Sequence, residues 1–195
     1  MATNTQGGFT MVEIVVMLAI LTAVSSIVLV SFSGISQSGA GNRALRELAL
    51  DIRRTQNMSL AVTKIAVGES PPVNQIPPAI GVQITKNSTS YIIFGDLPDP
   101  TSGQQDFKYT DPSEKIGPSR ALQGGVRAQR FLTESGQELP AGAIHILFSA
   151  PEADMLITDQ SGASLGDFAA IELTSASGQN LKQIRVRTSG QISIK

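Results

Sequence analysis

A single carboxylate interrupts a long apolar run near the N-terminus of this 195-residue chain. The run extends from Phe9 to Val30, and Glu13 lies close to its start. About 20 apolar residues in a helix are enough to cross a bilayer. A carboxylate in such a segment costs roughly 2.5–3.5 kcal/mol at its centre and less near its end, so by default it marks a functional site. The sequence therefore predicts a membrane-spanning helix in which Glu13 has a function.

Three aspartates gather in a segment that is rich in Pro and Gly: Asp96, Asp99 and Asp106. Clustered carboxylates on a loop can bind Ca²⁺. Their spacing is not that of an EF-hand, and Pro98 and Pro100 restrict the backbone between them. A calcium site is therefore one interpretation, and solvated loop acids are the favoured one.

The C-terminal segment is basic, and Arg185 and Arg187 alternate along it. Alternate residues of a strand share a face, so both guanidinium groups are expected to point the same way. They could contact DNA phosphates, but non-specific DNA binding needs several such contacts, and the formal net charge of the chain is −1. DNA binding through this pair is therefore an alternative and not the expected main function.

The sequence contains no group of residues with catalytic or zinc-ligating spacing. His145 is the only histidine and cysteine is absent, so a zinc site is not expected. His145 falls in the apolar segment 143–148 and is expected to be a partly buried strand residue, not a base. No phosphate-binding glycine loop or nucleophile elbow occurs. We expect neither an enzyme nor a cofactor.

Two kinds of hydrophobic periodicity divide the rest of the chain. Helical spacing runs from Asn42 to Ala66, and after a Pro-rich loop at 69–78 the period becomes two. The period of two predicts strands at 80–85, 90–94, 126–133, 143–149, 154–158, 169–174, 182–188 and 191–194. One helix followed by hairpins predicts an α+β fold, in which a long N-terminal helix, with a transmembrane half and an amphipathic half, packs on an antiparallel β-sheet head.

The expected domain organisation follows from these segments. It consists of a leader peptide at 1–8, a transmembrane and assembly helix at 9–32, a Gly/Ser hinge at 33–41, an amphipathic helix at 42–66 and a β-rich globular head at 67–195. A hinge or linker is expected because Gly34, Gly39 and Gly41 each weaken a helix by about 1 kcal/mol relative to Ala. The helix is expected to resume at Asn42, a good N-cap.

The stretch Gly7-Gly8-Phe9-Thr10-Met11-Val12-Glu13, with the apolar run behind it, resembles the processing and assembly signal of the type IV pilin-like superfamily. The resemblance implies that a prepilin peptidase cuts between Gly8 and Phe9 and that Phe9 is N-methylated. It also implies that the helix anchors the subunit in the membrane and later packs into a filament. The new α-amine of Phe9 is expected to pair with Glu13 of the same or a neighbouring subunit, because a cation at a helix N-terminus gains from a nearby anion.

Segments 48–56 and 184–194 resemble the branch of the superfamily that contains type II secretion H-type pseudopilins and FimT-like minor pilins. The resemblance implies a minor pilin or pseudopilin, with a major pilin still open, of a type IV pilus or type II secretion-like filament. The implied partners are prepilin peptidase, other pilin or pseudopilin subunits, an inner-membrane assembly platform and membrane lipid. Some FimT-like proteins bind DNA through basic C-terminal residues, which is the reason for naming Arg185 and Arg187.

The expected location is the cytoplasmic membrane, as a single-pass protein with its C-terminal head outside the cytoplasm, and then the filament. The arginines that follow the span, of which Arg43 is the first, favour a cytoplasmic C-terminus by the positive-inside rule. The resemblance implies the opposite orientation, and we follow the resemblance. Two alternatives remain: an adhesive or DNA-binding tip subunit, and a non-assembling domain held by an uncleaved anchor.

Overall fold

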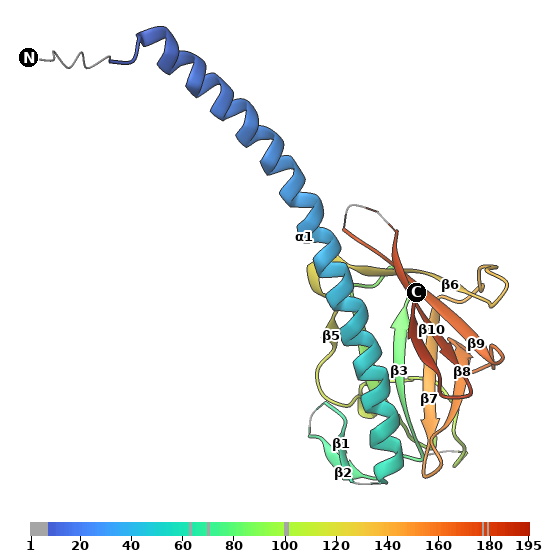
Figure 1. Ribbon diagram of the computed structural model, residues 1–195. Coiled ribbons are helices and arrows are strands. Elements are labelled where there is room, and N and C mark those ends of the chain that lie inside the picture. The colour runs from blue at the N-terminus through green and yellow to red at the C-terminus, as the bar shows by residue number, and fades with distance from the viewer. Residues whose placement is uncertain (1–7, 63, 70, 100–101, 177, 179) are drawn as a thin grey trace, which may run out of the picture. The chain divides into compact units, whose positions relative to one another are not determined.

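The computed structural model describes residues 8–62, 64–69, 71–99, 102–176, 178 and 180–195. The chain divides into two compact units, Met1–Gln37 and Ser38–Lys195, and each is described by itself. One long helix contributes to both units, and antiparallel strands form most of the second (Figure 1). The fold class is therefore α+β, as the sequence predicts.

The regular elements follow one another in a simple order, with one helix first and strands after it. They are α1 (Met11–Ala61), β1 (Ile65–Val67), β2 (Val73–Gln75), β3 (Ala79–Thr85), β4 (Ser90–Asp96), η1 (Pro112–Glu114), β5 (Arg120–Ala121), η2 (Gln123–Gly125), β6 (Arg127–Leu132), β7 (Ala143–Ser149), β8 (Asp154–Asp159), β9 (Phe168–Thr174), β10 (Asn180–Arg187) and β11 (Ile192–Ile194).

The first part of α1 is an exposed apolar helix. Thr10 caps it, because its Oγ1 accepts a hydrogen bond from the backbone N–H of Glu13 at 3.2 Å. The window Met11–Val28 has a mean hydropathy of 2.4, and none of it is buried. The hydroxyls of Thr22 and Ser26 donate to carbonyls of the preceding turn, at 3.0 and 2.8 Å, so they leave no unpaired group. By length and composition, this helix can span a membrane.

Helix α1 is continuous through the segment predicted to be a hinge. The expected break at 33–41 and the restart at Asn42 are therefore wrong. Strong helical segments flank the glycines on both sides, and a break would require a second, costly nucleation. Small residues also permit close packing here, since a Cβ added to Gly124 of η2 would lie 2.4 Å from the Cβ of Ala40. That 33–41 acts as a hinge stays a prediction.

Within the second unit, α1 buries the apolar face that its periodicity predicts. Leu45, Leu48 and Ile52 are at most 1% exposed. The helix ends at Ala61, short of the predicted end at residue 66. It stops there because Val62 has a φ of +43°, which lies outside the helical region, and the chain then enters β1.

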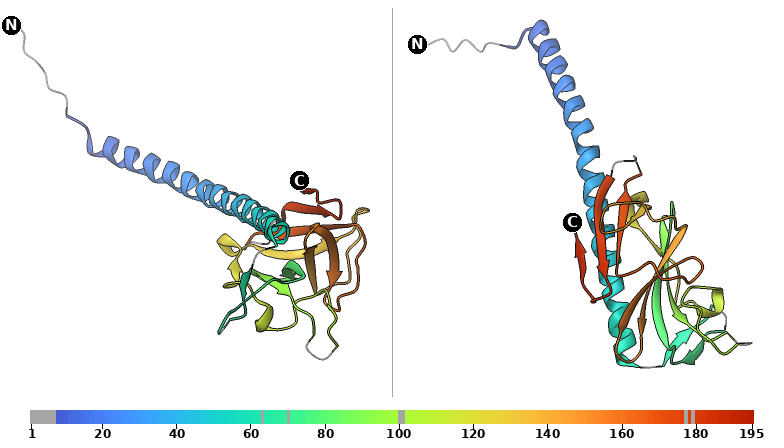
Figure 2. Two further views of the ribbon diagram at one scale, coloured as in Figure 1. Left: turned by 90° about the horizontal axis from the view of Figure 1, so that it is seen from below. Right: turned by 90° about the vertical axis from the view of Figure 1, so that its right-hand side faces the viewer.

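The strands form two main sheets and not the single sheet that the sequence predicts. One has the order β11-β10-β9-β6 and the other β5-β4-β3-β7-β8, and their neighbouring strands pair antiparallel. Both sheets share one apolar core with α1, to which Ile52, Ile146 and Ile184 belong. A single twisted sheet with this many strands tends to split into two sheets, and these can then pack on both sides of a shared core. The C-terminal strands, red in Figure 2, run beside the helix.

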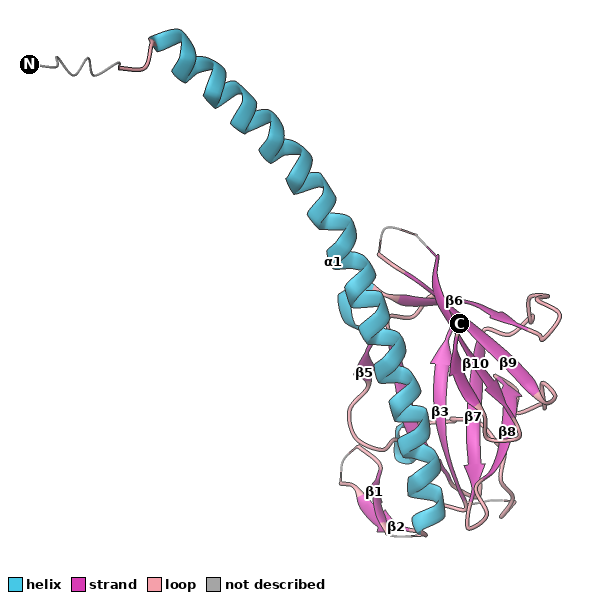
Figure 3. Ribbon diagram, viewed as in Figure 1, coloured by secondary structure: helices cyan, strands magenta, loops and turns pink. Residues whose placement is uncertain are grey.

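All eight predicted strands exist, with ends within two residues of those expected. The sequence did not predict β5 or the β1–β2 hairpin, because their two or three residues are too few to show alternation (Figure 3). A second, smaller apolar cluster lies on the outer face of the five-stranded sheet and includes Phe94 and Leu147. The described residues of the segment 97–118 cover this face, since Phe107 and Tyr109 pack against the cluster.

Candidate functional site

The Gly8–Phe9 junction lies at the exposed start of α1. Phe9 is 70% exposed, and a Cβ added to Gly8 would meet no atom within 4 Å. Glu13 lies in the first turn of the helix, with its side chain exposed. The leader before Gly8 lies outside the described residues. The structure therefore places Gly8, Phe9 and Glu13 together at one accessible end, and the amine predicted to pair with Glu13 would exist only after cleavage.

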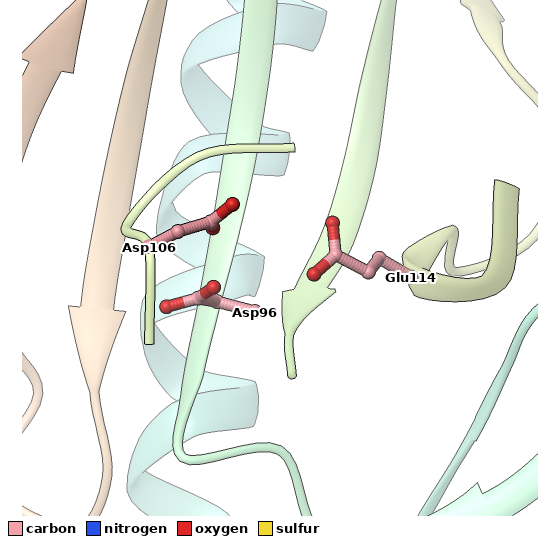
Figure 4. Close-up of side chains that lie close together, drawn as sticks. All are labelled: Asp96, Asp106 and Glu114. Atoms are coloured by element: carbon pink, nitrogen blue, oxygen red, sulfur yellow. The ribbon is translucent and has the colours of Figure 1, made fainter. Parts of the chain in front are cut away.

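A buried acidic cluster in the head unites two of the three predicted aspartates. Oxygens of Asp96, Asp106 and Glu114 lie within 4.8 Å of one another. In Figure 4, the side chains of Asp106 and Glu114 point toward each other, and the Asp96 carboxylate lies beside that of Asp106. Asp96 ends β4 on the same face as Phe94, so the covering segment 97–118 buries it completely.

Burial and like charge perturb the titration of this cluster. Burial raises the pKa of Asp96 to about 7, with further contributions from the charges of Asp106 and Glu114. Burial also raises the pKa of Glu114, although Thr110 N and Leu97 N donate to its carboxylate at 2.7 and 3.3 Å. The cluster therefore holds groups whose ionised forms are costly in their present surroundings.

The third predicted ligand, Asp99, is not a member of this group. Its Oδ1 accepts a hydrogen bond from Ser102 N at 2.8 Å, which holds a turn of the loop. Glu114 takes its place, and sequence reasoning missed it because the segment shows no periodicity. A signal did exist, since Asp111-Pro112-Ser113-Glu114 has the pattern of a capped helix start. Asp111 Oδ1 accepts from Ser113 N at 2.6 Å.

His145 is a fully buried strand residue, more deeply buried than predicted. Its Nδ1 lies 2.9 Å from the carbonyl of Asp159, which can only accept, so Nδ1 donates. In the neutral ring Nε2 then accepts from Gln83 Nε2 at 3.3 Å. Burial lowers the pKa of His145 against the opposing effects of the Asp159 carbonyl and the Asp106 charge, while Lys108 lowers it further. The neutral, hydrogen-bonded ring has a structural role.

Arg185 and Arg187 share one face of β10, as predicted, and line a hollow of about 160 Å³ with Phe168. The guanidinium of Arg187 lies 5.1 Å above the Phe168 ring and forms an ion pair with Glu134. One of the two cations thus already has an anionic partner. DNA binding by this pair stays a prediction.

A polar network that the sequence did not predict joins α1 to the five-stranded sheet. Asp51 is 7% exposed and accepts a 2.5 Å hydrogen bond from the hydroxyl of Tyr91 on β4. Its Oδ2 also lies 3.3 Å from Arg120 Nη1 on β5. Two turns later Ser59 Oγ donates to the Phe148 carbonyl at 2.8 Å. The sequence feature that could have indicated this network is a set of polar residues spaced four apart on an otherwise apolar face of the helix.

Comparison of the chain with protein-family models, with curated proteins and with solved structures gives no match. The case for a function therefore rests on the residues and the geometry described above.

Proposed function

We propose that this protein is a membrane-anchored subunit of a type IV pilin-like filament, a minor pilin or pseudopilin, that assembles through the first part of α1. The observation that carries the proposal is the apolar helix Met11–Val28, of which nothing is buried. Soluble monomers rarely expose apolar surface over such a length, so this helix requires lipid or other helices around it. A filament subunit meets both in turn: lipid before assembly and neighbouring helices after it.

The carboxylate at the start of this helix supports the same proposal. Thr10 caps α1, so an amine created at Phe9 would lie at the positive end of the helix dipole. A carboxylate in the first turn would offset that unfavourable placement. None of the described residues forms a hydrogen bond or an ion pair with the Glu13 carboxylate. Its proposed partner is the methylated amine of Phe9, in the same or a neighbouring subunit.

Such a subunit lies first in the membrane and then in the filament, and its partners follow from these two states. A prepilin peptidase cleaves between Gly8 and Phe9, an inner-membrane assembly platform extracts the anchored subunit from lipid, and other pilin or pseudopilin subunits receive it. The head lies outside the cytoplasm in both states. The Arg187–Glu134 ion pair argues against a DNA-binding tip, because it neutralises one of the two expected phosphate ligands.

The decisive test is N-terminal sequencing and intact-mass measurement of the protein purified from its native membrane. We expect a chain that begins at methylated Phe9. A chain that still begins at Met1 or Ala2, in cells with active prepilin peptidase, would overturn the proposal and favour a non-assembling anchored domain. Gly8→Val should block cleavage without disturbing the fold, because a Cβ at Gly8 meets no atom. Gly142→Val, at another open position in the head, is the matched control.

Assembly is tested separately by Glu13→Gln. We expect this variant to be cleaved at Gly8–Phe9 but to be lost from the filament fraction, because the neutral amide cannot pair with the amine. Glu47→Gln removes a charge from a later turn of the same helix and should assemble normally. Equal incorporation of both variants would show that the Glu13 charge has no part in assembly.

A further inference from the structure

Three carboxyl groups of the head, those of Asp96, Asp106 and Glu114, lie within 4.8 Å of one another. Asp96 is fully buried, Glu114 is 5% exposed and the side chain of Asp106 is 34% exposed. Among the described residues, the one cation in ion-pair contact with the cluster is Lys108, whose Nζ lies 3.7 Å from Asp106 Oδ2 and is partly exposed. Carboxylates held this close in a buried position repel one another unless a cation or protons lie among them.

One oxygen of the cluster has no protein donor. Asp96 Oδ2 accepts from Gln105 Nε2 at 3.2 Å, but Asp96 Oδ1 is buried and accepts no hydrogen bond from the described residues. Buried polar atoms are nearly always paired, so an unpaired carboxylate oxygen calls for an explanation such as an ion. The Asp96 carboxylate lies next to that of Asp106 (Figure 4), and one oxygen of each of the three residues lies within 4.8 Å of the others, so a ligand among the three would be within reach of Asp96.

We propose that Asp96, Asp106 and Glu114 bind a divalent cation, Ca²⁺, between the end of β4 and the segment that follows it. Oxygens bound to one Ca²⁺ at about 2.3–2.6 Å lie at most about 5 Å apart, whereas Mg²⁺ requires its ligands within about 4.2 Å. The oxygens of the cluster lie within 4.8 Å of one another, which is compatible with Ca²⁺, and an all-carboxylate site on a loop is typical of this ion. A hollow of about 440 Å³, lined by Asp106 and Glu114, gives the ion access and room for the waters that complete its shell.

The ion would join the end of β4 to two places in the segment 97–118. Asp96 ends β4, Asp106 lies in the segment 97–118 and Glu114 lies in η1. Binding would therefore fix this segment over the outer face of the sheet, in a chain that has no cysteine to cross-link it. This inference does not rest on the proposed filament function, because the cluster lies wholly within the head unit.

The test uses the full chain in detergent, freed of metal with EDTA and dialysed. We expect equilibrium dialysis to find Ca²⁺ bound in an equimolar amount. At Ca²⁺ about 100-fold above the dissociation constant, the Tm should rise by roughly 5–10 °C. Trypsin cleavage after Lys108 and Lys115 should slow in parallel. Absence of bound Ca²⁺ together with an unchanged Tm would overturn the proposal, and an equal or larger shift with Mg²⁺ would overturn the assignment to Ca²⁺.

The variants distinguish a cation from a proton shared within the cluster. Asp96→Asn removes a repelling charge, so in EDTA its Tm should equal or exceed that of the unaltered protein, but its Ca²⁺ shift should disappear. Glu114→Gln provides a second variant, with the same loss of shift expected. Asp154→Asn, the same change at an exposed site outside the cluster, should keep the full shift. A Ca²⁺ shift that survives in both cluster variants would show that the ion binds elsewhere.

Discussion

The buried bond between Tyr91 and Asp51 gives a direct test of how α1 is held to the sheet. Tyr91 is 2% exposed, and its hydroxyl donates to Asp51 Oδ2 at 2.5 Å. Tyr91→Phe removes this donor and keeps the ring. Among the described residues, the Asp51 carboxylate then retains only the 3.3 Å contact with Arg120, whose side chain is partly exposed. The helix thereby loses its shortest polar contact with β4.

The loss of stability expected for Tyr91→Phe follows from the type of hydrogen bond that is removed. A hydrogen bond to a charged, buried acceptor contributes roughly 1.5–3 kcal/mol. For a domain of this size, each kcal/mol lowers the Tm by roughly 2–4 °C, so Tyr91→Phe should lower it by roughly 3–12 °C. In an Asp51→Asn background the same change should cost less than about 1 kcal/mol, because the acceptor is no longer charged.

Thermal unfolding of the full chain in detergent, followed by circular dichroism of the strands, measures these values. The second tyrosine provides the matched control, since Tyr109 packs its ring on Phe94 and no described residue bonds to its hydroxyl. Tyr109→Phe should change the Tm little. Equal effects of the two substitutions, or an effect of Tyr91→Phe that is the same in both Asp51 backgrounds, would refute the reasoning.

Three further substitutions test the packing and the titration of the head. Gly81→Ala should destabilise it by about 1–3 kcal/mol, because the new Cβ would lie 2.8 Å from the ring of Phe94, while Gly142→Ala meets nothing and serves as the control in urea unfolding. Ser59→Ala should cost about 1 kcal/mol by removing the buried hydrogen bond from its hydroxyl to the Phe148 carbonyl of β7, which the same measurement detects. The pKa of His145 is lowered in the fold, so its contribution to stability is complete above its unfolded pKa of about 6.5 and is lost as the pH falls below it. His145→Gln should therefore lose less stability than the unaltered protein between pH 7 and pH 5.

Strand positions could be predicted because alternation directly reports burial on a sheet. In β7, Ile144, Ile146 and Phe148 face the shared core, while His145 and Leu147 face outward under the segment 97–118. Both faces of β7 are covered, so its apolar residues form a nearly continuous run, and the length of the run and its flanking turns indicate a strand where alternation does not. The division into two sheets could not be predicted, because it depends on which strands pair and not on the period of any one strand.

The members of the acidic cluster illustrate what local patterns miss. Asp96 and Asp106 were found because they lie in one acidic segment. Asp99 was included for the same reason, although its side chain holds a local turn instead. Glu114 joins the cluster only because Pro112–Glu114 folds back over the end of β4, where the Ile116 backbone bonds to Ile93. Proximity along the chain is a weak guide to a site that the fold assembles.

The polar residues of α1 distinguish its two parts more clearly than its apolar residues do. In the exposed part, the hydroxyls of Thr22 and Ser26 donate to carbonyls of their own helix, so these two groups need no partner outside it. In the head, Ser59 on the same helix bonds across to a strand. Glu13 fits neither pattern, because no residue that the structure describes pairs with its carboxylate. A helix that bonds the hydroxyls of Thr22 and Ser26 internally and leaves one carboxylate open at its capped end is suited to receive a cation from outside the chain, and a free amine on an incoming subunit is the partner that our proposal supplies.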